Sequence, residues 1–574
     1  MDQHVDLLFT GGQVFNVYLK RFLPAALAVR DGRIVYVGNE IERVTARKVQ
    51  DISGKYIVPG LIDSHMHIQS SMMAPHPFSD AVLPHGVTTV ISEPHEIANV
   101  FGLRGIEESM KAASTCALDI RLAMPSSVPS TRPELETTGG EIGVPDIETM
   151  LTWPKTICLG EVMNMHDVIY EPHCKVNQII DAMHEKAPLL PIEGHCPRIT
   201  GWELAAAIAR GVTSDHTEQQ MESMRQRLAA GVFIQLQKKS LHPDLLAYID
   251  ENRLEDRMAL VTDDTMPDAL LEKGHLDEII RIAVSMGYPA EKAIYCATYS
   301  PAQRMRLFDR GALDPGKLAD LVILDDPDTF AVNSVYKEGR RIEKAQEIHT
   351  SRAYPDDFYH SVHLVPLTAD DFRIPAPIQN GTVTCPVALV QEHSTMTIPS
   401  EADIPVKDGY IDWESTPYAL AAVFDRHSGS GRKGYMLVGG NAMTRGAAAS
   451  TYAHDHHNLI VLGRNRADMA NAANDVIRKQ GGMAVSDQGT ITGAISLPVA
   501  GILSEAPIEI LGKEAATFKS ALTALGYKQD NPIMSMTTLG LPVSPSLKVT
   551  DRGIIDVKRM AVIPFIKSVK KQAF

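Results

Sequence analysis

Between residues 60 and 310, short apolar segments alternate with amphipathic segments in a repeating order that few folds can satisfy. The apolar segments have the length and composition of buried strands, and the segments between them, such as ITGWELAAAIARG, have helical spacing. Eight strand-then-helix units over about 250 residues are typical of a closed (β/α)8 barrel. The eight predicted strands are LIDSHMHI, VTTVISEP, DIRLAMPS, TICLGEV, LLPIEGH, GVTSDH, GVFIQLQ and MALVTDD.

The segments on either side of this barrel (residues 60–310) have a different character. Residues 1–59 contain apolar runs separated by glycine-rich turns, and Asp31-Gly32 between two such runs predicts a hairpin. Residues 311–350 return to the same pattern in GALDPGKLADLVILDD, so we expect both segments to form one small β-sandwich-like domain. Residues 351–574 contain further strands and the helical segment RADMANAANDVIRKQGG. The predicted fold class is therefore α/β, with a TIM-type barrel, a small β domain and a separate C-terminal α/β or α+β domain.

Composition and charge narrow the class of partner. The 574 residues are 44% hydrophobic and 22% charged, which is enough apolar material for several folded cores. A net charge of −15 without a long run of Lys and Arg disfavours nucleic acid and anionic membranes as partners. No apolar run reaches the roughly 18 residues that span a bilayer, no signal peptide is recognised, and the six cysteines form no CxxC pair. These features predict a cytoplasmic protein, and the C-terminal domain is large enough to mediate a homodimer or a higher homo-oligomer.

The strongest local signal is His65-x-His67 at the end of the first predicted strand. Side chains two residues apart on a strand point to the same side, so the two imidazoles can reach one metal ion. Neutral imidazole is a common ligand of divalent metals. By the same parity, Asp63 and Gln69 are expected on this face. An isolated HxH is most often a pair of surface or packed histidines, but this one closes a barrel strand directly after a Pro-Gly turn, which favours a metal site.

Four further predicted strands end in residues of the types that bind metals, which are Glu161, His195, His216 and Asp263. The carboxyl ends of barrel strands meet at one face, where the active sites of such barrels lie. Each residue alone can equally be a solvated loop residue or a hydrogen-bonded core group, but together they predict a metal centre. With the two histidines of the first strand they are enough to hold two ions. A glutamate between two cations also has its buried charge neutralised.

Beyond these positions, the chain resembles the adenine deaminase family of the amidohydrolase superfamily. In the barrel, the resemblance rests on PGLIDSHMHIQSSMMAP, LPHGVTTVISEPHEIANVFG, LGEVMN, EGHCP, SDHTE and VTDDTMPDALLEKGHLD. It continues through RGAAASTYAHDHHNLIVLGRN, GGMAVSDQG and LPVSPSLKVTDRGIIDV, so it covers nearly the whole chain. Barrels with HxH are shared by many hydrolases, whereas the C-terminal stretches distinguish this family.

The resemblance implies hydrolytic deamination of adenine, a small-molecule purine, to hypoxanthine and ammonia. It also implies a divalent metal site that is binuclear and holds Mn(II) or Fe(II), with Zn(II) as an alternative. Asp263 is implied as the catalytic group that accepts a proton from the attacking water, because a bound metal lowers the pKa of water toward neutral. The implied metal ligands are His65, His67, Glu161, His195, His216 and Asp263.

Further positions are implied as site elements. The stretch that follows the second predicted strand lies at the active site in the family, so His95 is a candidate for substrate contact and Glu96 for catalytic proton transfer. Asp264 is expected to orient the substrate. The alternatives are a structural helix start for the first two and a hydrogen bond to a metal ligand for Asp264. The cluster His454-Asp455-His456-His457-Asn458 looks metal-binding in isolation but lies at no predicted strand end, so a lid or a contact between domains is favoured.

Two positions depart from the pattern of the family, because Gln69 and Thr217 stand where the family has Glu. Glutamine forms hydrogen bonds but carries neither a charge nor a transferable proton, and a weakened acid–base step slows a reaction by about 10²–10⁴-fold. Gln69 is therefore a candidate substrate contact that either lowers activity or selects a different heterocycle. Two other functions stay open, which are hydrolysis of another aminopurine, heterocycle or cyclic amide, and a non-catalytic purine-binding role.

Overall fold

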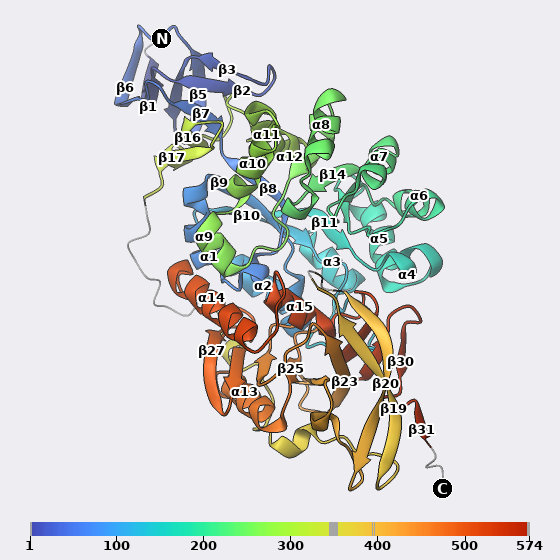
Figure 1. Ribbon diagram of the computed structural model, residues 1–574. Coiled ribbons are helices and arrows are strands. Elements are labelled where there is room, and N and C mark those ends of the chain that lie inside the picture. Colours follow the sequence, from blue (N-terminus) through green and yellow to red (C-terminus); the bar gives the residue numbers. More distant parts are fainter. Residues whose placement is uncertain (1–2, 344–353, 393, 395, 571–574) are drawn as a thin grey trace.

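The computed structural model describes residues 3–343, 354–392, 394 and 396–570. A small β domain lies at one end of the molecule, the barrel occupies the middle, and the C-terminal domain lies at the other end (Figure 1). This arrangement confirms the predicted fold class. The boundary that the sequence suggests between residues 350 and 351 falls outside the described residues.

All eight predicted barrel strands are present, and every neighbouring pair that shares a ladder is parallel. They lie in two sheets, in the orders β12-β11-β10-β9-β8 and β13-β14-β15. Parallel bridges between Ile192 and Val212 and between Met66 and Asp263 join the sheets, so the strands close into a barrel. The strands are β8 (Leu61–Met66), β9 (Val87–Ser92), β10 (Asp119–Met124), β11 (Thr156–Val162), β12 (Ile192–Gly194), β13 (Ser214–Asp215), β14 (Phe233–Leu236) and β15 (Met258–Leu260).

Helices surround these strands and bury them on their outer side. Strands covered on both faces are rich in apolar residues, and β8 and β9 are buried at every residue, including their polar ones. The helices are amphipathic, as in α10, where Leu276, Ile279, Ile280 and Ala283 are buried at helical spacing. No helix in the described part of the chain is long and apolar enough to cross a membrane. The helices of this region are α1 (Pro75–Val82), α2 (His95–Ala113), α3 (Val144–Met150), α4 (Met165–Tyr170), α5 (Lys175–Lys186), α6 (Gly201–Ala209), α7 (Met221–Ala229), α8 (Pro243–Glu251), α9 (Pro267–Lys273), α10 (Leu276–Ser285), α11 (Ala290–Cys296) and α12 (Tyr299–Arg304).

The small β domain combines segments from before and after the barrel. Its first sheet has the order β5-β4-β1-β6, and the hairpin between β4 and β5 turns at Asp31-Gly32, where both residues have positive φ as a tight hairpin requires. Its second sheet has the order β18-β17-β16-β7-β2-β3, in which the post-barrel strand β16 pairs with β7. The strands are β1 (Gln3–Thr10), β2 (Gln13–Asn16), β3 (Arg21–Pro24), β4 (Ala26–Arg30), β5 (Arg33–Gly38), β6 (Val44–Asp51), β7 (Tyr56–Pro59), β16 (Leu321–Asp326), β17 (Ala331–Lys337) and β18 (Arg340–Arg341).

The C-terminal domain is built on one large mixed sheet with helices α13 (Arg466–Arg478), α14 (Ile508–Ala524) and α15 (Pro532–Thr537). The sheet has the order β21-β20-β19-β23-β22-β25-β24-β26-β27, and a smaller sheet has the order β28-β29-β30. The strands are β19 (Gly381–Val390), β20 (Thr397–Lys407), β21 (Tyr410–Ile411), β22 (Ala419–Phe424), β23 (Lys433–Gly440), β24 (Ala447–Ser450), β25 (Leu459–Gly463), β26 (Gly482–Asp487), β27 (Thr490–Ser496), β28 (Leu547–Thr550), β29 (Gly553–Asp556), β30 (Ala561–Ile563) and, paired with β19, β31 (Ser568–Lys570).

The C-terminal domain and the barrel share one hydrophobic core. Buried side chains of the barrel, such as Ile97, belong to the same apolar cluster as Tyr452 and Leu503 of the C-terminal domain. Backbone hydrogen bonds join the two parts as well, because Ser504 N donates to Met72 O at 2.7 Å and Ser504 O accepts from the amide of residue 74 at 2.8 Å. These contacts lie just beyond the end of β8, so they hold the C-terminal domain against the carboxyl ends of the barrel strands.

Candidate metal centre

The six predicted ligands converge at the carboxyl end of the barrel. Strand β8 carries His65, and β11 carries Glu161 one residue before its end. The other ligands directly follow their strands or stand a few residues beyond them, which places all six side chains at one face. Five of them are buried, whereas the side chain of His195 is 35% exposed. The chain positions predicted from sequence are His65, His67, Glu161, His195, His216 and Asp263.

Glu161 lies between two groups of nitrogen donors. Its Oε1 atom is 3.4 Å from Nε2 of His67. Its Oε2 atom is 2.9 Å from Nδ1 of His195 and 3.1 Å from Nε2 of His216. Because the two carboxylate oxygens face different histidines, Glu161 has the geometry of a carboxylate that bridges two cations.

Asp263 completes the group around the first strand. Its Oδ1 atom is 3.5 Å from Nε2 of His65 and 3.5 Å from Nε2 of His67. The Asp263 backbone has a positive φ of 59°, a conformation that aspartate and asparagine tolerate better than most residues. Backbone hydrogen bonds to β8 hold it there, since Asp263 N donates to His65 O at 3.2 Å and His67 N donates to Asp263 O at 3.3 Å.

The donor set fits divalent metal ions. Imidazole and carboxylate ligands suit Mn, Fe and Zn, and the ligand atoms of His65, His216 and Asp263 lie within 4.8 Å of one another, as do those of Glu161, His195 and His216. Two buried atoms at the centre, Nε2 of His65 and Oε2 of Glu161, make no hydrogen bond within the described residues. Buried polar atoms without a partner are unfavourable, and a bound cation would satisfy both.

Electrostatics keep the two carboxylate ligands and His65 in the forms that bind metals, whereas neighbouring carboxylates raise the pKa of His216 to about 9 and that of His67 well above its usual value. Burial opposes ionisation of Glu161, but the contacts with His195 and His216 outweigh burial and hold the pKa of this carboxyl well below its usual value. Burial also opposes ionisation of Asp263, and its contacts with two histidines again hold the pKa well below the usual value. Burial lowers the pKa of His65 to about 4, so this imidazole is neutral at pH 7. Ionised carboxylates and neutral imidazole are the ligand forms that a metal requires.

Neighbouring groups orient the ligands. The His67 ring places Nδ1 3.0 Å from the backbone oxygen of Glu93, which leaves Nε2 to face the centre. Glu93 also accepts a hydrogen bond from the Glu161 amide at 2.8 Å, and Ser126 Oγ donates to the Glu161 carbonyl at 2.9 Å. Glu93, which sequence analysis did not single out, directly follows β9, and its carboxylate lies within 4.8 Å of ligand atoms of His67 and Glu161. Its position at a strand end is the signal that would have found it.

The strand parity that groups Asp63 with His65 does not extend to Gln69. Strand β8 ends at Met66, and Ile68–Ser71 forms a 3-10 turn, so Gln69 does not continue the strand face. Gln69 is buried, and its Oε1 atom has no hydrogen-bond partner among the described residues. Asp63 lies within β8 and accepts hydrogen bonds from Thr262, two residues beyond β15, at 2.6 Å from Oγ1 and 3.2 Å from the amide nitrogen. Burial raises the pKa of Asp63 to about 7.

The candidate substrate residues lie around the same centre. His95 places Nδ1 3.8 Å from Oε1 of Glu161, and its Nε2 is 3.7 Å from Oε1 of Glu96. Both residues also begin helix α2, which is the position that the structural alternative predicts. Asp264 is exposed and accepts a hydrogen bond from Ser70 Oγ.

The cluster of residues 454–458 reaches this centre from the C-terminal domain. Asp455 Oδ1 is 3.8 Å from Nε2 of His95, and His454 Nδ1 is 4.0 Å from Oε1 of Glu96. The cluster therefore lies at a contact between domains and also beside the metal centre. The position of the cluster beside the metal centre leaves no strand-end signal in the sequence, because it depends on how the C-terminal domain packs against the barrel.

Thr217 has a structural role beneath the centre. Its amide and its Oγ1 donate to the carboxylate of Asp215 at 3.1 and 3.0 Å. Asp215 also pairs with the guanidinium of Arg227 from α7, and both side chains are almost fully buried, at 0% and 1% exposure. These contacts hold Asp215 and Thr217, the residues on either side of His216, in place.

Replacing Arg227 with Met is expected to destabilise the barrel by about 3–5 kcal/mol, because Asp215 is left as a buried charge without its partner. Urea and thermal unfolding, followed by circular dichroism, measure the change. Arg225→Met is the matched control, since Arg225 lies exposed on the same helix. Equal unfolding midpoints for the two variants would show that the ion pair adds nothing to stability.

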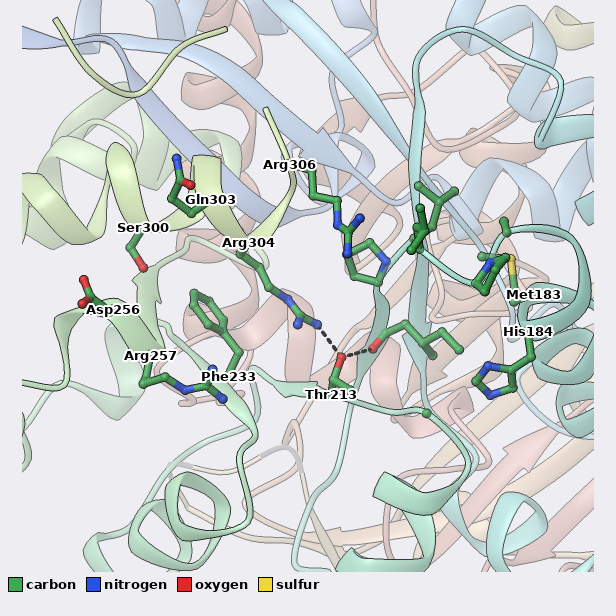
Figure 2. A pocket seen from close by; sticks show the side chains of 17 residues that line it. Met183, His184, Thr213, Phe233, Asp256, Arg257, Ser300, Gln303, Arg304 and Arg306 are labelled. Atoms are coloured by element: carbon green, nitrogen blue, oxygen red, sulfur yellow. Dashed lines mark hydrogen bonds between the residues drawn. The ribbon is translucent and has the colours of Figure 1, made fainter. Parts of the chain in front are cut away.

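A separate cavity of about 550 Å³ lies at the other end of the barrel (Figure 2). Its lining includes Ile192 and Phe233, the first residues of β12 and β14. Arg304 points into it and donates hydrogen bonds to Glu193 and to Thr213 Oγ1. Since the strands run from this end toward the ligands, the cavity is not part of the metal centre.

Comparisons with known proteins place both parts of the chain. A model of the amidohydrolase family matches residues 56–342, and a model of the adenine deaminase C-terminal domain matches residues 394–561. An adenine deaminase 2 of Shouchella clausii is 44% identical over 573 residues, which are 99% of this chain and 100% of that protein. An adenine deaminase of Clostridium perfringens is 43% identical over 571 residues, 98% of this chain and 100% of that protein.

Among solved structures, a crystal structure of an adenine deaminase is similar to 59% of this chain and 100% of its own, with 18% identity and a TM-score of 0.46. That likeness is too remote to bear on function. The full-length relatives and the two family matches together cover both the barrel and the C-terminal domain. The chain therefore belongs to the adenine deaminase family of the amidohydrolases, a group of metal-dependent hydrolases.

Proposed function

We propose that this protein hydrolyses adenine to hypoxanthine and ammonia. The observation that carries the proposal is the position of Glu161, whose two oxygens face separate groups of histidines in a chain whose full-length relatives are adenine deaminases. Such a site is suited to water attack on a polarised carbon, and the hydrogen-bonding groups around it are suited to a purine.

We propose that the centre holds two divalent ions, Mn(II) or Fe(II), with Zn(II) as the alternative. Asp263 would hold one ion together with His65 and His67, which both face its carboxylate, His195 and His216 would hold the other, and Glu161 would be shared. A divalent ion at these donors supplies a Lewis acid that lowers the pKa of water toward neutral.

Asp263 handles protons at this centre. Its carboxylate is held ionised by His65 and His67, and its side chain is 11% exposed, so a substrate can approach it. It accepts a proton from the water whose oxygen bonds to C6 of adenine, and it delivers a proton to the amino nitrogen as the C6–N bond breaks. The second hydrogen of water ends on ring nitrogen N1, and Glu96, whose Oε1 lies 3.7 Å from Nε2 of His95, is the group that we propose assists that transfer.

Metal removal tests the proposal. Protein purified without oxygen and loaded with Mn(II) or Fe(II) is expected to release ammonia from adenine, and chelator treatment is expected to reduce the rate to background until metal is restored. Metal analysis and an ammonia assay measure both. A metal-loaded preparation that turns over no aminopurine would refute the proposed reaction.

A second candidate function keeps the metal centre and changes the substrate to another aminopurine, heterocycle or cyclic amide. The observation that favours it is Gln69, a buried amide with an unpartnered oxygen where the family has Glu. A panel of such substrates tested beside adenine distinguishes the two functions. A non-catalytic purine-binding role is disfavoured because all six ligand positions are retained.

Replacing Gln69 with Glu is expected to raise kcat/KM for adenine by about 10²-fold, because it restores a group that can carry a proton beside the centre. Steady-state kinetics with metal-loaded protein measure the change. The control is Gln226→Glu on the outer helix α7. A rate on adenine that stays the same or falls would show that Gln69 does not limit deamination.

The assembly and location of the protein remain predictions. We propose a homodimer or a higher homo-oligomer in the cytoplasm, supported by the size of the C-terminal domain and by the composition of the sequence. Sedimentation velocity tests the assembly. Neither nucleic acid nor a membrane is proposed as a partner, given the net charge of −15.

A further inference from the structure

The HDHHN segment, residues 454–458, connects β24 to β25 in the C-terminal domain. All five of its side chains are buried, with exposed fractions between 0% and 5%. Buried polar side chains require hydrogen-bond partners, and the partners of these five divide them into two groups.

Three of the residues hold the segment in place. His456 Nδ1 accepts from the amide of Asn458 at 2.9 Å, and His457 Nδ1 accepts from the amide of residue 453 at 3.2 Å. The Asn458 amide group donates to the carbonyl of Thr137 at 2.7 Å and accepts from the amide of Arg426 at 3.1 Å. Asn458 therefore anchors the segment to the barrel, whereas the bonds of His456 and His457 lie within residues 453–458 and leave the buried Nε2 atom of each without a hydrogen-bond partner among the described residues.

The other two residues face the metal centre. Asp455 Oδ1 lies 3.4 Å from Nδ1 of His454 and 3.8 Å from Nε2 of His95. His454 Nδ1 lies 4.0 Å from Oε1 of Glu96. Since His95 Nδ1 is in turn 3.8 Å from Oε1 of Glu161, the pair is separated from the bridging carboxylate by one side chain.

Several polar atoms in this corner are buried and have no hydrogen-bond partner among the described residues. They are His454 Nε2, Asp455 Oδ2 and both carboxylate oxygens of Glu96. Native proteins rarely leave such atoms unpaired, and a cluster of them beside a reactive centre indicates a ligand with matching donors and acceptors. A metal ion does not explain the pair, because none of the metal-compatible groups among the described residues includes His454 or Asp455.

We propose that His454 and Asp455 bind the purine directly, so that the C-terminal domain supplies one wall of the substrate site. The inference rests on the proposed function, because adenine is the ligand whose ring nitrogens and N–H groups match these atoms. A purine presents both acceptors and donors around its edge, which an imidazole and a carboxylate recognise together. The barrel supplies the metals and the groups that transfer protons, and these two residues supply contacts to the heterocycle.

The variants Asp455→Asn and His454→Gln test the inference in full-length, metal-loaded protein. Each is expected to lower kcat/KM for adenine by about 10- to 100-fold, mainly through KM, since each weakens a hydrogen bond between a charged or polar side chain and the purine ring. Metal content and the thermal midpoint are expected to match those of wild type. Asp370→Asn and His360→Gln are matched controls, because their side chains are 79% and 61% exposed in the same domain.

Analogue binding distinguishes direct contact from a structural role. Dissociation constants are measured by calorimetry in an Asp263→Asn background, with adenine and its 1-, 3- and 7-deaza analogues. Protein with the wild-type residues at 454 and 455 is expected to bind the analogue that lacks the contacted ring nitrogen more weakly than adenine. In the variant of the contacting residue, this loss of affinity is expected to be about tenfold smaller. The two residues are tested separately, so one variant that fails to fold does not end the test.

The outcomes separate this inference from the proposed reaction. Equal analogue penalties in variants and wild type, or lost stability with an unchanged KM, would overturn the role of the pair in binding. A wild-type protein that binds adenine without releasing ammonia overturns the proposed reaction and leaves the binding test intact. A protein that binds no purine overturns both.

Discussion

Replacing Glu161 with Gln is expected to remove at least one metal ion per chain and to slow ammonia release by roughly 10³-fold or more. Loss of a group that only supports a metal ligand already reduces affinity or activity by 10–100-fold, and Glu161 contacts both groups of histidines itself. The amide is neutral, so two cations facing it would repel each other without the shared negative charge. Metal analysis after gel filtration and an ammonia assay at saturating adenine measure the two effects.

The control for this variant is Glu251→Gln at the exposed end of helix α8. It removes the same charge at a distance from the centre and is expected to keep wild-type metal content and activity. If Glu161→Gln retains full metal content and a rate within tenfold of wild type, Glu161 does not bridge the ions.

The barrel could be predicted from the sequence because its signal is local. A strand covered on both faces is rich in apolar residues, and β8, β9 and β14 are buried at every residue although each also contains polar side chains. The metal ligands could be predicted from the sequence for a related reason, since a barrel brings the residues at its strand ends to one face. Histidine and carboxylate residues at such positions therefore carry information about the site even without the fold.

The rest of the site depends on information that no short window contains. The side-chain alternation that places His65 stops at Met66, where the chain enters a 3-10 turn, so the same rule misplaced Gln69. The position of Asp455 depends on a core that joins two domains, and hydrogen bonds near Ser504 fix that contact. The only local sign of such long-range packing in the sequence is a group of polar residues within an otherwise apolar region.

Replacing Asp263 with Asn is expected to lower kcat by about 10²–10⁴-fold while KM changes little, because the variant keeps the shape of the side chain and loses the proton acceptor. The backbone makes this substitution informative. Asp263 has a φ of 59°, and asparagine adopts this left-handed region nearly as readily as aspartate. Steady-state kinetics together with metal analysis measure the effect.

Comparison with Asp263→Ala distinguishes the effect of losing the carboxylate from the effect of changing the backbone conformation. Alanine is strained at positive φ, so this variant is expected to disturb the hydrogen bonds that join residue 263 to His65 and His67 as well as the proton transfer. The asparagine variant should therefore keep the thermal midpoint of wild type, whereas the alanine variant should lower it. Equal losses of kcat in both variants, with stability lost only in alanine, assign the catalytic effect to the carboxylate. A kcat for Asp263→Asn within tenfold of wild type, with metals retained, would move the proton acceptor to another residue.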